Sequence, residues 1–218
     1  LHIVRAGLKA TGGAIAWLVR LLWGSEPDDR AYATLLAEAA VAHGGRAGLF
    51  WSPAFLGTGT PDGDDGAHAA LIGATLQHTR GDVLRALLEA LAFWLRHNLD
   101  TLETLTGQTL PTVRLVGGSA RLELLTHLKA TISGRSILVP DIVEGSALGA
   151  ALLAGISCGV FASAADAFAS LRLHERMYEP APGEREVYER LYHEVHRALH
   201  PALAPLNQRL SQVVRSGG

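Results

Sequence analysis

Two glycine-rich turns are the parts of this sequence best suited to approach a ligand. Gly117, Gly118 and Ser119 follow a short apolar run and precede a helical pattern. Adjacent glycines let the backbone turn sharply and come close to a flat ligand, and free amides at a helix start can bind polar groups. Gly12 and Gly13 form a similar turn near the start of the chain. Taken alone, the pair Gly117-Gly118 is explained better as a residue pair that only makes the turn, and Gly12-Gly13 by tight packing of a helix on a sheet, than by ligand binding.

Neither turn carries a known phosphate-binding signature. The segment around Gly117 and Gly118 lacks the lysine of a Walker motif and the third glycine of a dinucleotide fingerprint. Ser119 and Ser146 have no histidine in an arrangement that would make either a nucleophile. The residues alone therefore indicate no catalytic group.

Histidines on one helical flank could in principle bind a metal. His193, His196 and His200 recur at i, i+3 and i+7. No acidic residue in the same row completes a site, so a solvated helix face explains them better.

Paired carboxylates have structural explanations of the same kind. Asp28-Asp29 stands where a helix starts, and Asp64-Asp65 lies in a glycine-rich loop, so capping and loop solubility account for them. Glu144 stands at another expected helix start, where the positive end of the helix dipole favours a carboxylate.

Composition excludes several classes of protein. The 218 residues include 19 Lys and Arg and 21 Asp and Glu, for a net charge of −2, and charged residues make up only 18%. A nucleic-acid-binding protein needs clustered basic residues, and no apolar run is long enough to span a bilayer. The lone Cys158 excludes an internal disulfide and fits a reducing compartment, so we expect a cytoplasmic protein.

The chain begins at Leu1 and its only methionine is Met177, so we expect it to be a piece of a longer protein.

Strand and helix patterns alternate along the chain and predict an α/β domain with a mixed or parallel sheet. We expect strands at residues 1–9, 47–51, 113–116 and 137–139, and a long surface loop at 52–66. We expect helices at residues 14–23, 32–43, 81–106, 121–133 and 145–158, the last buried on most sides. A final helical segment, 184–214, should be broken or bent by Pro201 and Pro205.

The order of these segments resembles the C-terminal domain of the FGGY carbohydrate kinases. The resemblance covers nearly the whole chain and is carried by residues 12–18, 48–53, 57–61, 72–80, 85–93, 116–121 and 143–155. Each motif is loose, but the ordered set is specific. The tail at residues 188–192 and 200–203 is more similar to the xylulokinase-type members than to the glycerol kinases.

The resemblance implies a ribonuclease-H-like, actin-like ATPase fold. Residues 1–218 would form the nucleotide-binding half of a two-domain sugar kinase, with the first sheet strands truncated. An N-terminal domain, absent from this chain, would bind a pentulose-type sugar and hold the catalytic Asp. The reaction would transfer the γ-phosphoryl group of ATP to a sugar hydroxyl with Mg²⁺, and the enzyme could form a homodimer. This chain alone should be inactive.

The resemblance also assigns nucleotide-binding residues, and it assigns no catalytic residue and no metal ligand to this chain. The adenosine pocket would be lined on one side by Gly12, Gly13, Ile15 and Ala16. It would be closed on the other side by Gly117, Gly118, Ser119 and Leu122.

Three positions depart from the family's pattern. Ser119 stands where glycine is common, Leu122 where a small polar residue is usual, and His68 where arginine is frequent. These departures keep open an alternative function, a non-catalytic nucleotide-binding or oligomerisation module derived from the same fold.

Overall fold

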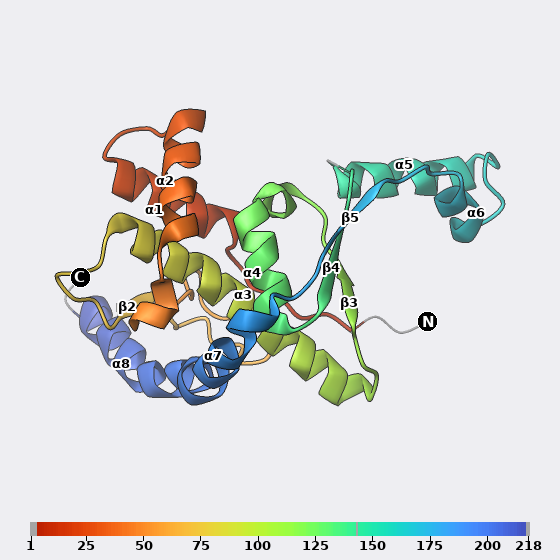
Figure 1. Ribbon diagram of the computed structural model, residues 1–218. Coiled ribbons are helices and arrows are strands. Elements are labelled where there is room, and N and C mark those ends of the chain that lie inside the picture. Colours follow the sequence, from red (N-terminus) through yellow and green to blue (C-terminus); the bar gives the residue numbers. More distant parts are fainter. Residues whose placement is uncertain (1–3, 143, 217–218) are drawn as a thin grey trace.

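The computed structural model describes residues 4–142 and 144–216. Helices surround one long central helix on one side of the molecule, and a small sheet and a projecting helical arm form the other side (Figure 1). The helices are α1 (Gly12–Trp23), α2 (Asp29–Val41), α3 (Arg80–Thr106), α4 (Glu123–Ser133), α5 (Gly145–Ser157), α6 (Ala164–Ala169), α7 (Arg185–Arg190) and α8 (Arg197–Ser216). The strands are β1 (Phe50–Ser52), β2 (Ala70–Ile72), β3 (Thr112–Arg114), β4 (Ser136–Pro140) and β5 (Glu175–Tyr178). Short 3₁₀ helices span Gly44–Ala47, Gly118–Arg121 and Pro182–Glu184.

Helix α3 is the centre of the fold. It begins with a capping box, in which Thr79 and Asp82 each bind the other's backbone amide, and it ends at Gly107 in the left-handed conformation. The backbone amides of Thr79 and His43 and the Thr79 hydroxyl donate to the Asp82 carboxylate. These bonds outweigh desolvation and lower the pKa of Asp82 to about 2. Helices α1, α2 and α4 and strand β1 pack around α3, so one apolar core forms along its length.

The sheet is mixed, as expected. β3 and β4 run parallel, and β4 pairs with β5 in the antiparallel direction. A separate antiparallel pair joins β1 to β2. The predicted strand at 113–116 corresponds to β3 and that at 137–139 to β4, whereas β2, β5 and α6 are not indicated by the sequence patterns. The predicted strand at 47–51 starts only at Phe50, because Gly44–Ala47 forms a 3₁₀ helix.

The predicted strand at residues 1–9 is wrong for the residues that the structure describes. Residues 4–10 form no strand, and residues 1–3 lie outside the described part. This segment instead runs along the loop that follows β1. Lys9 forms an ion pair with Asp65, and the Gly7 carbonyl approaches Gly59 so closely that a Cβ there would overlap it. Alternating polarity alone does not make a strand when the segment has a loop as its neighbour.

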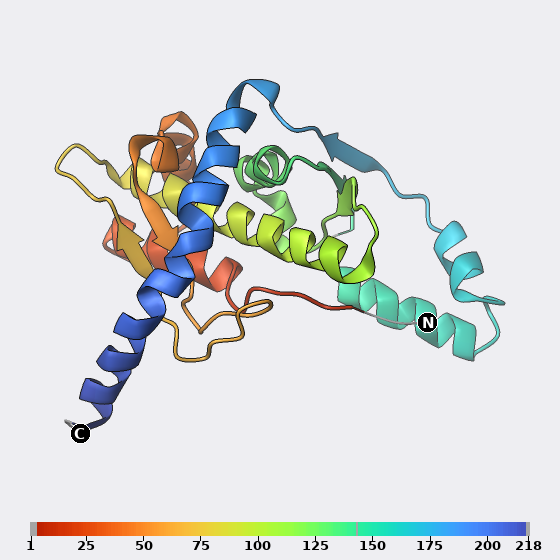
Figure 2. The ribbon, with the colours of Figure 1, turned by 90° about the horizontal axis from the view of Figure 1, so that it is seen from below.

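Helix α5 is placed as predicted, but its burial is not. None of its residues is buried, although the sequence is almost entirely small or apolar. It packs against α6, and Figures 1 and 2 show the two helices standing apart from the rest of the molecule. Glu144 occupies the N-cap position, and its side chain makes no capping hydrogen bond. An apolar sequence indicates only that a helix could be buried by a neighbouring element. Within the described residues, no element buries α5.

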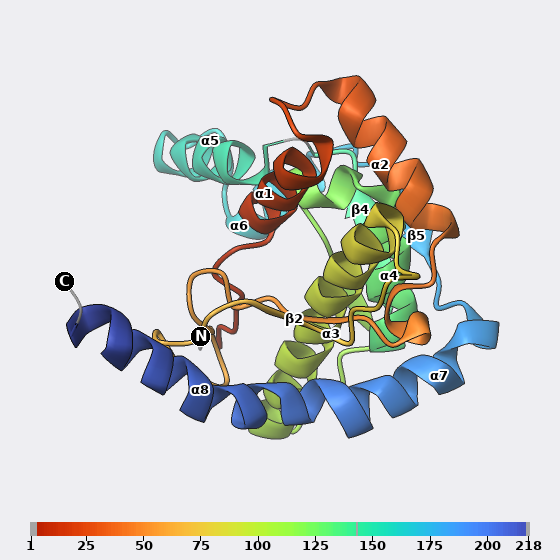
Figure 3. The ribbon, with the colours of Figure 1, turned by 90° about the vertical axis from the view of Figure 1, so that its left-hand side faces the viewer.

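The C-terminal segment forms one long rod. α7 continues through a π-helix, Leu191–His196, directly into α8 (Figure 3). Pro201 and Pro205 lie inside α8, so of the expected break or bend the break does not occur. Proline removes a backbone donor, and helices tolerate it where the local hydrogen-bond ladder is already shifted, as it is next to a π-helix.

A buried charge pair joins this rod to α3. Arg85 Nε donates to Glu89 Oε1 over 2.8 Å, and the Tyr188 hydroxyl donates to the same oxygen over 2.8 Å. Arg85 Nη2 donates to the Tyr188 hydroxyl over 3.1 Å, and the Gly45 amide donates to Glu89 Oε2 over 2.6 Å. Glu89 is 1% exposed and Tyr188 is fully buried. Every partner of this pair is therefore supplied from inside the core.

The pair predicts a large loss of stability on removing one charge. We expect Glu89→Leu to lower the free energy of unfolding by about 3–5 kcal/mol, because Arg85 would remain buried without its carboxylate. The matched control is Glu194→Leu. Glu194 pairs with Arg190 at the same i, i+4 spacing with most of both side chains exposed, so it should cost about 1 kcal/mol or less. Urea unfolding of both variants measures the difference, and equal effects would contradict the burial argument.

Candidate functional site

The first glycine turn lies at the exposed start of α1. Gly12 and Gly13 are exposed, and no atom lies within 4 Å of the position that a Cβ would take on either. Ile15 is only 2% exposed and packs in the core, whereas Ala16 is half-buried. The side chain of Ile15 therefore holds α1 against the core, and the open surface of the turn is backbone.

The second glycine turn leads from β3 into a 3₁₀ helix. Gly117 has φ 93° and ψ −178°, a conformation in which any side chain would be strained. As at the first turn, the space beside Gly117 and Gly118 is open. The Ser119 carbonyl accepts a hydrogen bond from the Leu122 amide over 3.3 Å, which fixes the turn against α4.

The two turns are positioned by the same core. Leu122 is half-buried and packs against the apolar cluster that contains Ile15 and Leu18 of α1. Its side chain therefore points into the protein. The polar residue that is usual at this position in the family would need a hydrogen-bond partner there.

A groove of about 520 Å³ lies beside the second turn. It is lined by Ala120 and Arg121, by the carboxyl end of β4 and by the start of β5, and α1 does not contribute to it. Arg176 bonds Glu123 over 2.8 Å at its edge. A hydrogen bond from Arg114 holds the pKa of Glu175 below its usual range. The carboxyl ends of β-strands are a common place for ligands in open α/β sheets.

His68, the third departure from the family's pattern, lies far along the chain from both turns and contacts the C-terminal rod. Its Nε2 lies 3.3 Å from the Ser211 hydroxyl of α8. In this structure the His68 side chain therefore helps to hold α8 against the loop that carries it.

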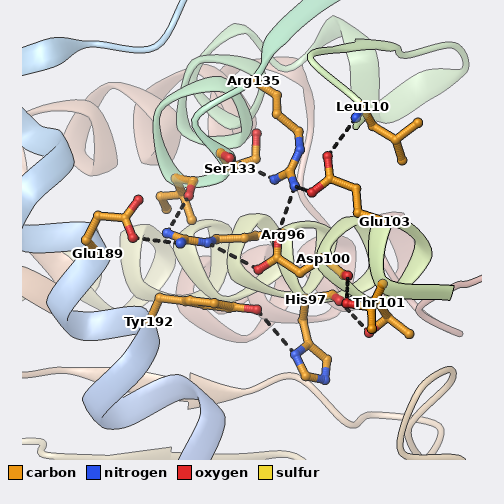
Figure 4. A network of polar contacts seen from close by, with 12 residues as sticks. Arg96, His97, Asp100, Thr101, Glu103, Leu110, Ser133, Arg135, Glu189 and Tyr192 are labelled. Atoms are coloured by element: carbon orange, nitrogen blue, oxygen red, sulfur yellow. Dashed lines mark hydrogen bonds and ion pairs between the residues drawn. The ribbon is translucent and has the colours of Figure 1, made fainter. Parts of the chain in front are cut away.

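A polar network that the sequence patterns do not indicate connects α3, the end of α4 and α7 (Figure 4). Arg96 Nη2 donates to Glu189 over 2.7 Å. Arg135 Nη2 donates to Asp100 over 2.9 Å and to Glu103 over 2.7 Å. Three carboxylates thus face two guanidinium groups, and Arg96 also lies 4.0 Å from the centre of the Tyr192 ring. The only hint of this network in the sequence is that Asp100 and Glu103 stand one turn apart in the predicted helix. The same spacing of acidic residues is common on exposed helices, so it does not indicate a network.

The histidines predicted to lie on a solvated helix face separate in the structure. His193 is exposed, but His196 is 7% exposed and stacks on Phe93 and Tyr192, so the prediction is wrong for His196. His196 follows the buried Tyr188 and Tyr192 at spacings of four residues, so it lies on the face of the rod that packs against α3. Within residues 4–142 and 144–216, no group of three or more His, Cys, Asp or Glu side chains is arranged to hold a metal ion.

Comparison with known proteins identifies the family. Residues 2–158 match the sequence pattern of the FGGY family of carbohydrate kinases, C-terminal domain. The chain belongs to the FGGY family. A glycerol kinase from Koribacter versatilis (strain Ellin345) is 37% identical over 139 residues, which are 64% of this chain and 28% of that protein. A glycerol kinase from Gloeobacter violaceus is 34% identical over 186 residues, 85% of this chain and 36% of that protein.

Solved structures of FGGY kinases share the fold. Xylulose kinase from Rhodospirillum rubrum superposes with a TM-score of 0.76 at 34% identity, covering 92% of this chain and 40% of that one. Plasmodium falciparum glycerol kinase with ADP superposes with a TM-score of 0.68 at 25% identity, covering 86% of this chain and 37% of that one. The predicted ribonuclease-H-like, actin-like ATPase fold class is thereby confirmed.

This FGGY chain spans 28% to 36% of the length of these curated relatives. In the part that the structure describes, no helix is both long enough and apolar enough to cross a bilayer.

The buried histidine makes stability depend on pH. Burial lowers the pKa of His196 to about 3, from an ordinary value of 6.5. Between these values only the unfolded chain takes up the proton, so the stabilisation is complete above pH 6.5 and is lost as the pH falls. We expect the free energy of unfolding to drop by about 2 kcal/mol between pH 6.5 and 5 from this group.

Urea unfolding at several pH values tests this expectation. His196→Phe preserves the ring stacking and should flatten the curve between pH 6.5 and 5. His193→Phe, on the exposed side of the same π-helix, should leave the slope as it is in the unaltered chain. An unchanged slope in His196→Phe would contradict the prediction.

Proposed function

We propose that this chain supplies the adenine-nucleotide-binding half of an ATP-dependent kinase that phosphorylates a hydroxyl group of a pentulose or related polyol. Family membership supports phosphoryl transfer to a carbohydrate. The ADP named with the Plasmodium falciparum glycerol kinase supports an adenine nucleotide. Cytoplasmic location is part of the proposal, since such substrates and ATP occur there.

The observation that carries the proposal is the open space at the two glycine turns. Gly12, Gly13, Gly117 and Gly118 have nothing within 4 Å of a Cβ position, so a ligand can approach their backbone. Gly59 differs, because a Cβ there would lie 1.8 Å from a carbonyl oxygen, so glycine at that place permits close packing. Other glycines, such as Gly24 and Gly183, are as open as the two turns. The two turns are distinguished by their position, because one leads into α1 and the other, through a 3₁₀ helix, into α4. Backbone amides exposed in this way suit the polar edge and ribose of a nucleotide.

When bound, ATP supplies the phosphoryl group that is transferred. In this proposal the residues of this chain bind and orient it: Gly12, Gly13 and Ala16 on one side, and Gly117, Gly118 and Ser119 on the other. Ile15 and Leu122 hold the two turns in place from the core. Orientation is the main protein contribution to phosphoryl transfer, because the reacting oxygens must be in line.

Mg²⁺ is expected for such a reaction, but the described residues do not fit a site for it. No cluster of carboxylates or histidines among them converges on a common point. We therefore assign no residue of this chain to the metal and derive no step through it.

A second folded domain would complete the enzyme in this proposal. α5 has no buried residue, and Leu153 and Val160, at the far end of this arm, are 65% and 69% exposed. Uncovered apolar surface of this kind is typical of an interface. That domain would bind the sugar and hold the catalytic Asp. The pentulose preference is supported by the resemblance of the tail and by the match to the Rhodospirillum rubrum xylulose kinase.

The glycine turns generate a test of nucleotide binding. We expect Gly118→Ala to weaken binding of ATP by about tenfold or more, because the added methyl group projects into the open space. Gly183→Ala is the matched control, since its Cβ also meets no atom and it lies in a different 3₁₀ helix. Isothermal titration calorimetry with ATP and ADP measures both, and thermal melting confirms that the variants are folded.

Calorimetry also separates the proposal from the alternative module. Leu122 favours that alternative, because its side chain packs into the core and offers no hydrogen bond to a base. Binding at millimolar concentration or better supports the kinase half. No heat from the unaltered chain at several millimolar nucleotide would favour a binding or oligomerisation module that has lost the site.

Turnover gives a second test. This chain incubated with ATP, Mg²⁺ and a panel of pentuloses should yield no sugar phosphate, because the base and most sugar contacts are assigned to the other domain. A coupled assay for ADP and mass spectrometry for the product measure this. Robust turnover by the chain alone would overturn the division of labour proposed here.

A further inference from the structure

An apolar stripe on α8 continues past the body of the protein. Leucine recurs along this helix at Leu199, Leu203, Leu206 and Leu210, so the spacing alternates between four and three residues. This is the spacing of the a and d positions of a heptad, which place their side chains on one seam of a helix. Leu199 and Leu203 use the seam to pack on the core around α3. The sequence therefore extends a packing seam beyond the residues that the core covers.

The distal part of this seam is largely exposed among the described residues. Leu206 is 59% exposed, Leu210 54% and Val214 68%, whereas Leu199 is 8% exposed. Figures 2 and 3 show the last turns of α8 extending away from the other helices. A surface hollow of about 370 Å³ opens between the seam and His68 of the loop that follows β1, and Leu210 and Val214 form its apolar wall. Clustered apolar side chains with this exposure are typical of a docking surface.

The two prolines of α8 do not obstruct this seam. With about 3.6 residues per turn, Pro201 and Pro205 fall on the face opposite Leu206 and Leu210. Both prolines are exposed. The seam itself presents only apolar side chains at heptad spacing, and such side chains fit between those of another helix. The shape of the surface therefore suits a second helix.

The charges of α8 limit which helix can dock. The helix contains three arginines, Arg197, Arg209 and Arg215, and no Lys, Asp or Glu, although the whole chain has a net charge of −2. Arg209 is exposed and flanks the seam, because it directly precedes Leu210. A second copy of α8 would bring another arginine and no carboxylate to this flank. A helix with acidic residues beside its own seam would pair with Arg209 instead.

A lipid surface fits α8 less well than a helix does. Amphipathic helices that lie on membranes combine a broad apolar face, often with Trp or Phe, and a polar face rich in basic residues. α8 has no aromatic residue, its apolar stripe is one seam wide, and three arginines are its only Lys or Arg residues in 20 positions.

We propose that the distal half of α8 is a docking surface for an acidic amphipathic helix of a partner protein. The apolar seam of that helix packs on Leu206, Leu210 and Val214 and fills the hollow beside His68, and a carboxylate beside the seam pairs with Arg209. The end of α8 and the α5 arm lie on opposite sides of the molecule (Figures 1 and 2). The surface also shares no residue with the glycine turns, so the proposal does not depend on the proposed kinase function.

Two synthetic peptides test the shape and the charge of this surface. Both have about three heptads with Leu at a and d, and the flanking e and g positions are Glu in one peptide and Lys in the other. We expect the 218-residue chain to bind the acidic peptide at micromolar concentration and the basic peptide about tenfold more weakly or less. The affinity for the acidic peptide should fall as salt is added, because the charges are exposed. Fluorescence anisotropy of labelled peptides measures both affinities.

Three variants of the chain locate the binding. The double variant Leu206→Ser, Leu210→Ser should raise the dissociation constant for the acidic peptide by about tenfold or more, because the seam loses apolar contact. Leu153→Ser is the matched control, since Leu153 of α5 is 65% exposed and lies outside the seam, and it should leave the constant unchanged. Arg209→Glu should weaken binding of the acidic peptide and strengthen that of the basic one. All four side chains are exposed, so thermal melting should show folded variants.

Three results would overturn the proposal. The first is equal affinity for the two peptides, or an equal loss of affinity in Leu153→Ser and in the double variant. The second is a dimer of the unaltered chain, seen by analytical ultracentrifugation, that the double variant abolishes, since a second copy would then occupy the seam. The third is binding to vesicles of phosphatidylserine and phosphatidylcholine in the absence of binding to the acidic peptide.

Discussion

The buried pair of Arg85 and Glu89 is the interaction on which the rest of this structure depends. Two charges in a core are tolerated only when hydrogen bonds satisfy them, and here the partners come from Tyr188 and from the Gly45 amide. Those partners belong to α7 and to the 3₁₀ helix before β1, so the pair fixes both segments against α3. An apolar core could bury the same area with less constraint on orientation. The pair thus explains why the rod docks in one register.

This register determines the second layer of contacts. Once Tyr188 is fixed, the next turn of the rod brings Glu189 to Arg96, and Tyr192 stacks beneath the same guanidinium. One turn further along, His196 stacks on Phe93. Each contact depends on the one before it, because fixing one residue of a helix also fixes the directions in which the other residues point. The position of His196 is therefore a consequence of polar contacts made two turns earlier.

The sequence predicts this arrangement only in part, for a physical reason. α3 is predicted almost to the residue, because its apolar periodicity is strong and Thr79 and Gly107 mark its ends. Local patterns carry no information about what lies opposite. The sequence overestimates the burial of α5, because an apolar pattern cannot say whether a neighbour is present. It misplaces His196, because the spacing of the histidines does not show which face of the rod α3 covers. The glycine turns were located correctly, yet their shared dependence on the core through Ile15 and Leu122 emerges only in three dimensions.

Leu122 shows how packing and binding compete at one position. It follows a turn in which Gly117 must adopt a positive φ, so the backbone direction at residue 122 is set before its side chain is chosen. A polar side chain there could reach outward to a ligand but would leave the core cluster incomplete. A leucine packs against that cluster, which stabilises the fold by less than the about 1.5–3 kcal/mol of a fully buried side chain, because Leu122 is only half-buried. In the proposed nucleotide site, recognition would then be left to the backbone. An open surface made of glycine backbone can still bind a nucleotide, because its amides are not needed for packing. In the proposed site, affinity would rest on the rigidity of the turns, which pack on the core around α3 through Ile15 and Leu122.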